Sequence, residues 1–197
     1  MKPHFFGYGS LVNRHTHDYP DARAASVRGF RRVWRHTKLR EVAYLTVEEA
    51  PGHEIDGLIA SVPGGDWAAL DLREAAYQRR LVAAEDIRHD HPEVISVEIY
   101  QTRAADEAAP SVRYPVLLSY VDTVVAGFRD VFGDEGVTRF FATTDGWDIP
   151  VVDDRAAPIY ARAIRPDAAV RHRVDEALDG FSVMRLDLDA VRKLRDE

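Results

Sequence analysis

A short apolar strand that runs into a double-glycine turn dominates the start of the sequence. Residues 5–11 read FFGYGSL, so two glycines and a serine follow directly on aromatic residues. Glycine accepts positive φ and lets a ligand approach the backbone closely. Successive N–H groups in such a turn can form a concave anion site, for which a carboxylate is a natural guest. The alternative is a strand end with a tight turn and nothing bound.

This turn is not a dinucleotide-binding loop. That fingerprint needs a third glycine and a helix that follows directly, whereas residues 13–20 are polar and end in proline. The absence of cysteine excludes disulfides, thiolate zinc sites and thiol nucleophiles. We therefore look for chemistry carried by backbone amides, carboxylates and hydroxyl groups.

The pattern of the whole chain predicts an α+β fold with a mixed or mostly antiparallel sheet. Strands are expected at 4–8, 27–36, 42–47 and 55–62, with a turn at Pro51-Gly52, followed by a hairpin of 81–87 and 94–100. Helices are expected at 67–78, 116–132, 137–143, 168–178 and 188–194, and an ordered loop at 147–160. Asp66 is the expected N-cap of the first helix, and Gly133 the expected end of the second. The 197 residues predict a single domain.

Charge and hydropathy set the expected surroundings. The net charge of −7 argues against nucleic-acid binding. No segment approaches about 18 consecutive apolar residues, so no membrane span is expected, and the N-terminus lacks the pattern of a signal peptide. We expect a cytoplasmic protein. The histidine pairs at positions 15 and 17 and at 89 and 91 are interpreted as solvated side chains, and no metal is expected.

One carboxyl group falls on an apolar stripe. Trp67, Leu70, Glu74 and Tyr77 are spaced 3, 4 and 3 residues apart, which places them on one face of a helix. Glu74 is then directed inward, where burial raises the pKa of a carboxyl group and makes it a better general base. The alternative is a buried ion pair with an arginine such as Arg73, Arg31 or Arg79, which would lower that pKa instead.

The order of these motifs resembles the gamma-glutamylcyclotransferases. The segments are FGYGSL at 6–11, GFRRVW at 29–34 and LDLREAAY at 70–77. The resemblance is to the bacterial, ChaC-like or AIG2-like, part of that family. It implies a small mixed β-barrel with surrounding helices, over a domain of residues 1–197. The segment from about 112 to 197 would then be a helical and loop extension packed on the barrel.

The resemblance also implies an activity that needs no cofactor. A gamma-glutamyl group is cyclised to 5-oxoproline by its own α-amino group, and an amine or amino acid is released. Glu74 matches the catalytic glutamate, which takes the amine proton and passes one to the departing nitrogen. The loop that holds the glutamyl α-carboxylate and α-amine would be formed by Gly7, Tyr8, Gly9, Ser10 and Leu11. Tyr114 and Tyr120 are candidates to line the pocket or to pack in the core.

The identity of the leaving group is open at this point. The glycine- and asparagine-rich stretch followed by EYL of the glutathione-specific branch is absent, and residues 112–120 occupy its place. Glutathione, a gamma-glutamyl dipeptide and a gamma-glutamyl amine all remain candidate substrates. The sequence does not determine the oligomeric state. Two other functions are considered: a non-catalytic protein that binds small carboxylates on the same scaffold, and a hydrolase that pairs Glu74 with Asp71 or Glu41.

Overall fold

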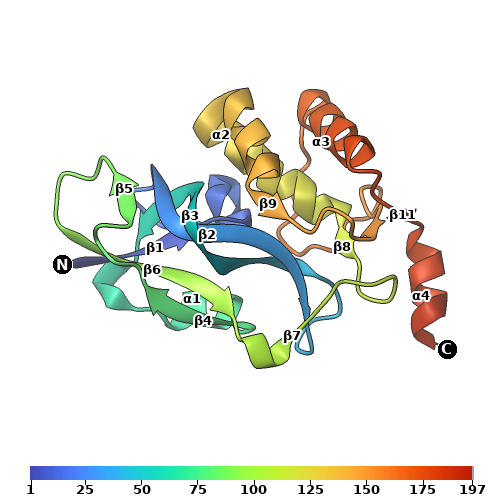
Figure 1. The fold of residues 1–197 in the computed structure, drawn as a ribbon, viewed down its shortest axis with the longest axis horizontal. Coiled ribbons are helices and arrows are strands. Elements are labelled where there is room, and N and C mark those ends of the chain that lie inside the picture. Colours follow the sequence, from blue (N-terminus) through green and yellow to red (C-terminus); the bar gives the residue numbers. More distant parts are fainter. Residues whose placement is uncertain (197) are drawn as a thin grey trace.

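The computed structural model describes residues 1–196 and shows an α+β fold, so Glu197 of the predicted domain lies outside the described residues (Figure 1). The main strands are β1 (Lys2–Gly7), β2 (Arg23–Thr37), β3 (Tyr44–Ser61), β4 (Tyr77–Leu81), β5 (Ile87–His89) and β6 (Ile95–Thr102). They lie in the order β4-β6-β1-β3-β2-β5, with β7 (Glu107–Ala108) and β9 (Thr144–Asp145) also paired to β2. Because β1 is parallel to β6 and antiparallel to β3, the sheet is mixed, as predicted.

A second, smaller sheet lies beside the helices. It consists of β8 (Val116–Leu117), β10 (Val151–Val152) and β11 (Arg185–Leu186), with β10 in the middle and parallel to both neighbours. The strand β10 lies within the segment 147–160 that the sequence predicts to be an ordered loop. The small sheet ties this segment to the start of the long helix and to the C-terminal part of the chain.

The long hairpin of β2 and β3 is the largest departure from the predicted strands. The expected strands 42–47 and 55–62 are parts of one strand, β3, and Pro51-Gly52 is not a turn between separate strands. The ladder is interrupted between Arg28 and Phe30, where residues 50–53 have no partner and Gly29 and Gly52 have φ of 85° and 84°. Proline, which donates no ladder hydrogen bond, is tolerated at such a bulge.

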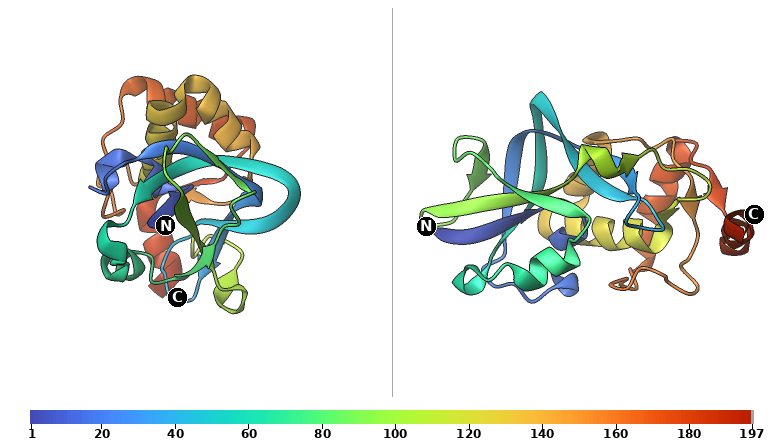
Figure 2. Two further views of the ribbon diagram at one scale, coloured as in Figure 1. Left: turned by 90° about the vertical axis from the view of Figure 1, so that its left-hand side faces the viewer. Right: turned by 90° about the horizontal axis from the view of Figure 1, so that it is seen from below.

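The sheet is strongly curled (Figure 2), so that side chains of β4 and β6 reach across to the first half of β3. The hydroxyl of Tyr77 on β4 donates to the carbonyl of Leu45 at 2.8 Å, and Nε2 of Gln101 on β6 donates to the carbonyl of Val47 at 2.9 Å. These bonds join β4 and β6 to the first half of β3. Side chains span this gap, and no backbone ladder closes the described strands into a complete ring. The expected barrel is therefore a curled open sheet.

Two helices, α2 (Leu118–Ala142) and α3 (Ala168–Gly180), lie together on one side of the large sheet (Figure 1). The short helix α1 (Ala68–Arg73) lies away from them beside β4, and α4 (Leu188–Asp196) lies at the C-terminal end. The helical path of α2 breaks at Gly133, where φ is 68°, so the predicted boundary between two helical segments is confirmed. Asp167 caps α3 by accepting a hydrogen bond from the N–H of Val170 at 2.7 Å. None of the helices in the described chain is long and apolar enough to cross a bilayer.

The first helix is shorter than predicted. It ends at Arg73, and Tyr77, expected on the same helix, begins β4 instead. The expected hairpin is shifted accordingly: β4 pairs antiparallel with β6, whereas residues 87–89 pair with β2. The N–H of Tyr77 bonds to the carbonyl of Glu74 at 2.8 Å, which turns the chain from the helix into the sheet.

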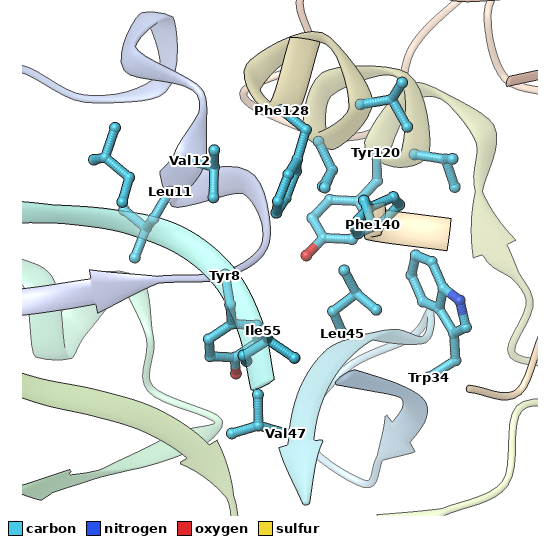
Figure 3. Close-up of a cluster of buried hydrophobic side chains, with 14 of the residues drawn as sticks. Tyr8, Leu11, Val12, Trp34, Leu45, Val47, Ile55, Tyr120, Phe128 and Phe140 are labelled. Carbon is cyan, nitrogen blue, oxygen red and sulfur yellow. The ribbon is translucent and has the colours of Figure 1, made fainter. Parts of the chain in front are cut away.

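The apolar core joins the sheet to α2. Trp34 and Leu45 from the hairpin pack with Tyr120, Phe128 and Phe140 from the helix (Figure 3). All of these side chains are buried. This packing places the glycine turn after β1 directly beside the first turn of α2, which is the arrangement that builds the candidate site.

Candidate active site

The glycine turn is a tightly packed segment of the chain between β1 and α2. After Gly7 the chain forms a single helical turn, closed by hydrogen bonds from Val12 N–H to the carbonyl of Gly9 at 3.0 Å and from Asn13 N–H to the carbonyl of Ser10 at 3.1 Å. A Cβ atom on Gly7 would lie 2.6 Å from the Cβ of Leu11. On Gly9 it would lie 2.8 Å from the hydroxyl of Tyr120. Both glycines are thus required by close approach.

Three backbone N–H groups of this turn make no hydrogen bond within the described chain. Within residues 1–196 we find no protein acceptor for the backbone N–H groups of Gly9, Ser10 and Leu11. Backbone donors at such a concave turn attract anions. The turn therefore offers hydrogen bonds that the described chain does not itself use.

A buried arginine on β2 donates a hydrogen bond to the glycine turn. Arg32 is fully buried and donates from Nε to the carbonyl of Tyr8 at 2.9 Å, from Nη1 to Oγ1 of Thr143 at 2.7 Å and from Nη2 to the carbonyl of Asp56. The hydroxyl of Tyr8 donates to the carbonyl of Tyr100 at 2.6 Å. The sequence analysis assigned Arg32 no role. Its place two residues before Trp34, on the inward face of a strand, is the signal that would have found it.

Glu74 lies inward, but not for the predicted reason. It follows the last residue of α1 with φ −99° and ψ 31°, so the helical stripe shared with Tyr77 does not exist. Its N–H bonds to the carbonyl of Leu70 at 2.9 Å. The turn that ends the helix aims the carboxylate toward the glycine turn, and its side chain is only 17% exposed.

Both alternatives considered for Glu74 are present at once. Its Oε1 lies 3.0 Å from Nε of Arg73, so the carboxylate is paired with an arginine. Arg73 also donates to the carbonyl of Thr16 at 2.9 Å and to Oγ of Ser10 at 3.3 Å. Burial nevertheless raises the pKa of Glu74, and this effect outweighs Arg73 and Arg40, which lower it. The pair orients the carboxylate without making it a weak base.

Two adjoining pockets meet at Glu74. The turn pocket is lined by Phe6, Gly7, Tyr8, Gly9, Ser10, Leu11, Leu45, Glu74, Tyr77, Tyr100 and Tyr120. The arginine pocket is lined by Ser10, Arg40, Tyr44, Arg73, Glu74, Tyr77, Tyr120, Tyr160 and Arg162. Their empty volumes, including the part open to solvent, are about 320 and 370 Å³. Figure 3 shows Tyr8, Leu45 and Tyr120 of the turn pocket where the sheet meets α2.

The structure brings the predicted site residues together, with one exception. The glycine-turn residues, Glu74 and Tyr120 all line the turn pocket. Tyr114 does not, because it stacks on the ring of His36 with centroids 3.8 Å apart and is 38% exposed. Tyr100, Arg40 and Arg162 were missed, since each reaches the site from a segment that carries no motif.

The described linings of these two pockets contain no carboxylate other than Glu74. Asp71 instead accepts hydrogen bonds from Nε of Arg79 and from the hydroxyl of Tyr100, both at 2.7 Å. Glu41 lines a different pocket. A hydrolase with two carboxylates therefore lacks its second group at this site.

One cluster among the described residues has the composition of a metal site. Ligand atoms of His4, Asp21 and His91 all lie within 4.8 Å of one another. Nε2 of His91 lies 2.8 Å from Oδ2 of Asp21, and the His91 side chain is 2% exposed. The interpretation of this histidine as solvated is thus wrong. None of the three residues lines the turn pocket or the arginine pocket.

Free turn amides, a largely buried acid of raised pKa and several tyrosines thus lie together around one small pocket. The chain belongs to the family described as gamma-glutamyl cyclotransferase, AIG2-like, whose model matches residues 5–116, more than half of the sequence. No curated protein matches it.

Solved structures agree on the fold. A structure named gamma-glutamyl cyclotransferase is 14% identical, with a TM-score of 0.54 over 88% of this chain and 98% of its own. The uncharacterized protein loc79017 from Homo sapiens is also 14% identical, with a TM-score of 0.55 over 87% and 97%. YkqA from Bacillus subtilis is 16% identical, with a TM-score of 0.55 over 74% and 56%. At these identities the likeness concerns the fold alone.

Proposed function

We propose that this protein is a gamma-glutamyl cyclotransferase that converts a gamma-glutamyl group to 5-oxoproline and releases an amine or amino acid. The observation that carries the proposal is the position of Glu74. It is a buried carboxyl group with a raised pKa, and it lines the same pocket as the free amides of the glycine turn. Membership of the AIG2-like family supports the same reaction.

The chemistry needs one proton carrier and a precise conformation. The substrate's α-amino nitrogen attacks its own δ-carbonyl carbon, a C–N bond forms, and the amide C–N bond to the leaving group then breaks. Glu74 takes the proton from the attacking ammonium group and returns one to the departing nitrogen. Because the attack is intramolecular, holding the folded-back conformer supplies up to roughly 7–11 kcal/mol of the barrier.

The turn pocket supplies complementary groups for this substrate. The amides of Gly9, Ser10 and Leu11 are suited to the α-carboxylate. Burial raises the pKa of Tyr120 well above its ordinary value, so its hydroxyl stays protonated. That hydroxyl has no hydrogen bond to the protein within the described chain, and we assign it as a donor to the developing oxyanion.

The direct test is product formation. Purified protein is incubated with glutathione, gamma-glutamyl dipeptides and gamma-glutamyl amines, and 5-oxoproline is measured. Release from at least one substrate is expected, and Glu74→Gln should lower it by at least a hundredfold, within the range of about 10²–10⁴ for acid–base groups. Glu135→Gln is the matched control, since Glu135 is 95% exposed on α2. No 5-oxoproline from any substrate, with folded protein, would sink the proposal.

The ion pair favours one second candidate. Because Arg73 occupies one oxygen of Glu74 at 3.0 Å, the pocket could hold a small carboxylate without turning it over. A gamma-glutamyl ligand that raises the melting temperature but yields no product would identify such a binding protein.

A further inference from the structure

The arginine pocket is strongly cationic in an acidic protein. The net charge of the chain is −7, yet the lining of this pocket includes three arginines and only one acid. Arg73 is paired with Glu74. Arg40 donates to the carbonyl of Arg73 at 3.2 Å and lies 5.7 Å from the Tyr44 ring centre. In the part of the chain that the structure describes, neither Arg40 nor Arg162 forms a salt bridge within 4.0 Å, although the charge of each lowers the pKa of Glu74.

The loop that carries Arg162 is anchored to α2. The N–H of Ile159 donates to Oδ2 of Asp154 at 2.8 Å, and Asp154 itself accepts hydrogen bonds from the N–H and the hydroxyl of Ser119 on α2 at 2.8 and 2.6 Å. Farther along the loop, the N–H of Ile164 donates to Oγ1 of Thr123 at 3.3 Å. The side chains of Asp154 and Thr123 are buried, whereas Arg162 is exposed. The backbone on both sides of Arg162 is therefore fixed, and its side chain is presented at the mouth of the pocket.

The position of Glu74 sets the direction of the substrate. Glu74, Ser10 and Tyr120 line both pockets, so the carboxylate lies where the pockets meet. In the proposed reaction Glu74 gives its proton to the departing nitrogen, which must lie at this junction. With the glutamyl group in the turn pocket, the leaving group extends into the arginine pocket.

We propose that the arginine pocket is a subsite for a carboxylate on the leaving group. The substrates are then gamma-glutamyl amino acids or short gamma-glutamyl peptides, and not gamma-glutamyl amines or polyamines. Guanidinium groups bind carboxylates through charge-assisted, often bidentate hydrogen bonds, whereas a cationic amine would meet like charges. This inference rests on the proposed function and names its substrate class.

The test compares two substrates that differ only in this charge: gamma-glutamylalanine and its C-terminal amide. We expect kcat/KM to be at least about tenfold higher for the free carboxylate, the effect of one hydrogen bond to a charged group. Arg162→Gln should bring the ratio of the two kcat/KM values, carboxylate over amide, closer to one. We compare this ratio and not the separate rates, because Arg162 also lowers the pKa of Glu74 and its loss would affect the turnover of both substrates.

Arg165→Gln is the matched control. It removes the same charge from an exposed position three residues away that does not line the pocket, and the ratio should remain that of the wild type. The preference should also weaken with added salt, as expected for an ion pair at a partly exposed site.

The outcomes separate this inference from the proposed function. Equal kcat/KM for the two substrates in the wild type, with 5-oxoproline released from both, overturns the subsite and leaves the activity standing. If neither substrate is turned over, calorimetric titration of both into the wild-type protein decides. Tighter binding of the carboxylate form, lost in Arg162→Gln, supports the subsite, whereas equal binding or none overturns it.

Discussion

The close approach of Gly9 to Tyr120 predicts what a single methyl group will do. A Cβ atom on residue 9 would lie 2.8 Å from the Tyr120 hydroxyl, well inside ordinary van der Waals contact. Tyr120 cannot swing aside, because the rings of Trp34, Tyr44 and Tyr160 lie 6.0, 4.9 and 5.1 Å from its own. Overpacking of this kind costs about 1–3 kcal/mol. We therefore expect Gly9→Ala to lower the free energy of unfolding by that amount.

The structure also predicts a rescue. Tyr120→Phe removes the oxygen that the new methyl group meets, so the double variant should recover part of the loss from Gly9→Ala. Urea denaturation of the four proteins gives the coupling energy directly. In a thermal scan each kcal/mol corresponds to about 2–4 °C for a chain of this size.

The control for the glycine substitution is Gly180→Ala. No atom lies within 4 Å of a Cβ built there, so that change should be neutral or slightly stabilising at the end of α3. If the coupling energy between positions 9 and 120 is zero, the Tyr120 hydroxyl is not what excludes a larger residue at position 9, and our reasoning about Gly9 is refuted.

Three further changes test other parts of the site. The raised pKa of Glu74 favours folding below its ordinary value of 4.5, and this contribution is lost as pH rises through the folded-state pKa. Glu74→Gln should thus gain stability relative to wild type between about pH 4 and about pH 7 in urea denaturation; a pH-independent difference would contradict this. Arg32→Met removes the hydrogen bonds that the carbonyls of Tyr8 and Asp56 accept from the guanidinium group, at about 1–3 kcal/mol for a buried group left without a partner. Unchanged stability would show that Arg32 does not hold the turn. Asp71→Asn should keep most 5-oxoproline release, since its carboxylate is bound to Arg79 and Tyr100; loss as large as that of Glu74→Gln would revive a two-carboxylate mechanism.

Local signals predicted the parts of the fold that depend on a few adjacent residues. The break of α2 at Gly133 was visible because glycine, which accepts positive φ, commonly ends a helix, and Gly133 has a φ of 68° here. Pro51-Gly52 misled for the same reason, since the pair is a turn signal in isolation. In the structure β2 pairs with β3 on both sides of residues 50–53, so this segment is a bulge within one strand and not a turn between two. Strand pairing is a long-range property, so local patterns could not supply it.

The candidate site divides in the same way. The glycine turn is a continuous motif, and its free amides follow from its own backbone. The sequence analysis placed Glu74 inward on a helical stripe that the structure lacks. Glu74 reaches the pocket because α1 ends at Arg73, the residue directly before it. Tyr100 and Arg162 join the site from β6 and from a loop after β10. Their contributions arise from the packing of distant segments, which no spacing along the chain records.

The same contrast between one continuous motif and distant segments bears on how the proposed substrate would be selected. The match to the family spans residues 5–116, which include the glycine turn, Arg40 and Glu74. Tyr120, Tyr160 and Arg162 lie beyond it, and two of these three, Tyr160 and Arg162, line only the arginine pocket. Apart from Tyr120, the groups that would hold and cyclise the glutamyl moiety thus come from the matched segment. Arg162, which would select the leaving group, comes from the loop that is hydrogen-bonded to α2. A change of leaving-group preference then requires substitutions in that loop and none in the glycine turn. Arg162→Glu should accordingly move the preference from the carboxylate toward the C-terminal amide or a cationic amine, and an unaltered preference would place the selection elsewhere.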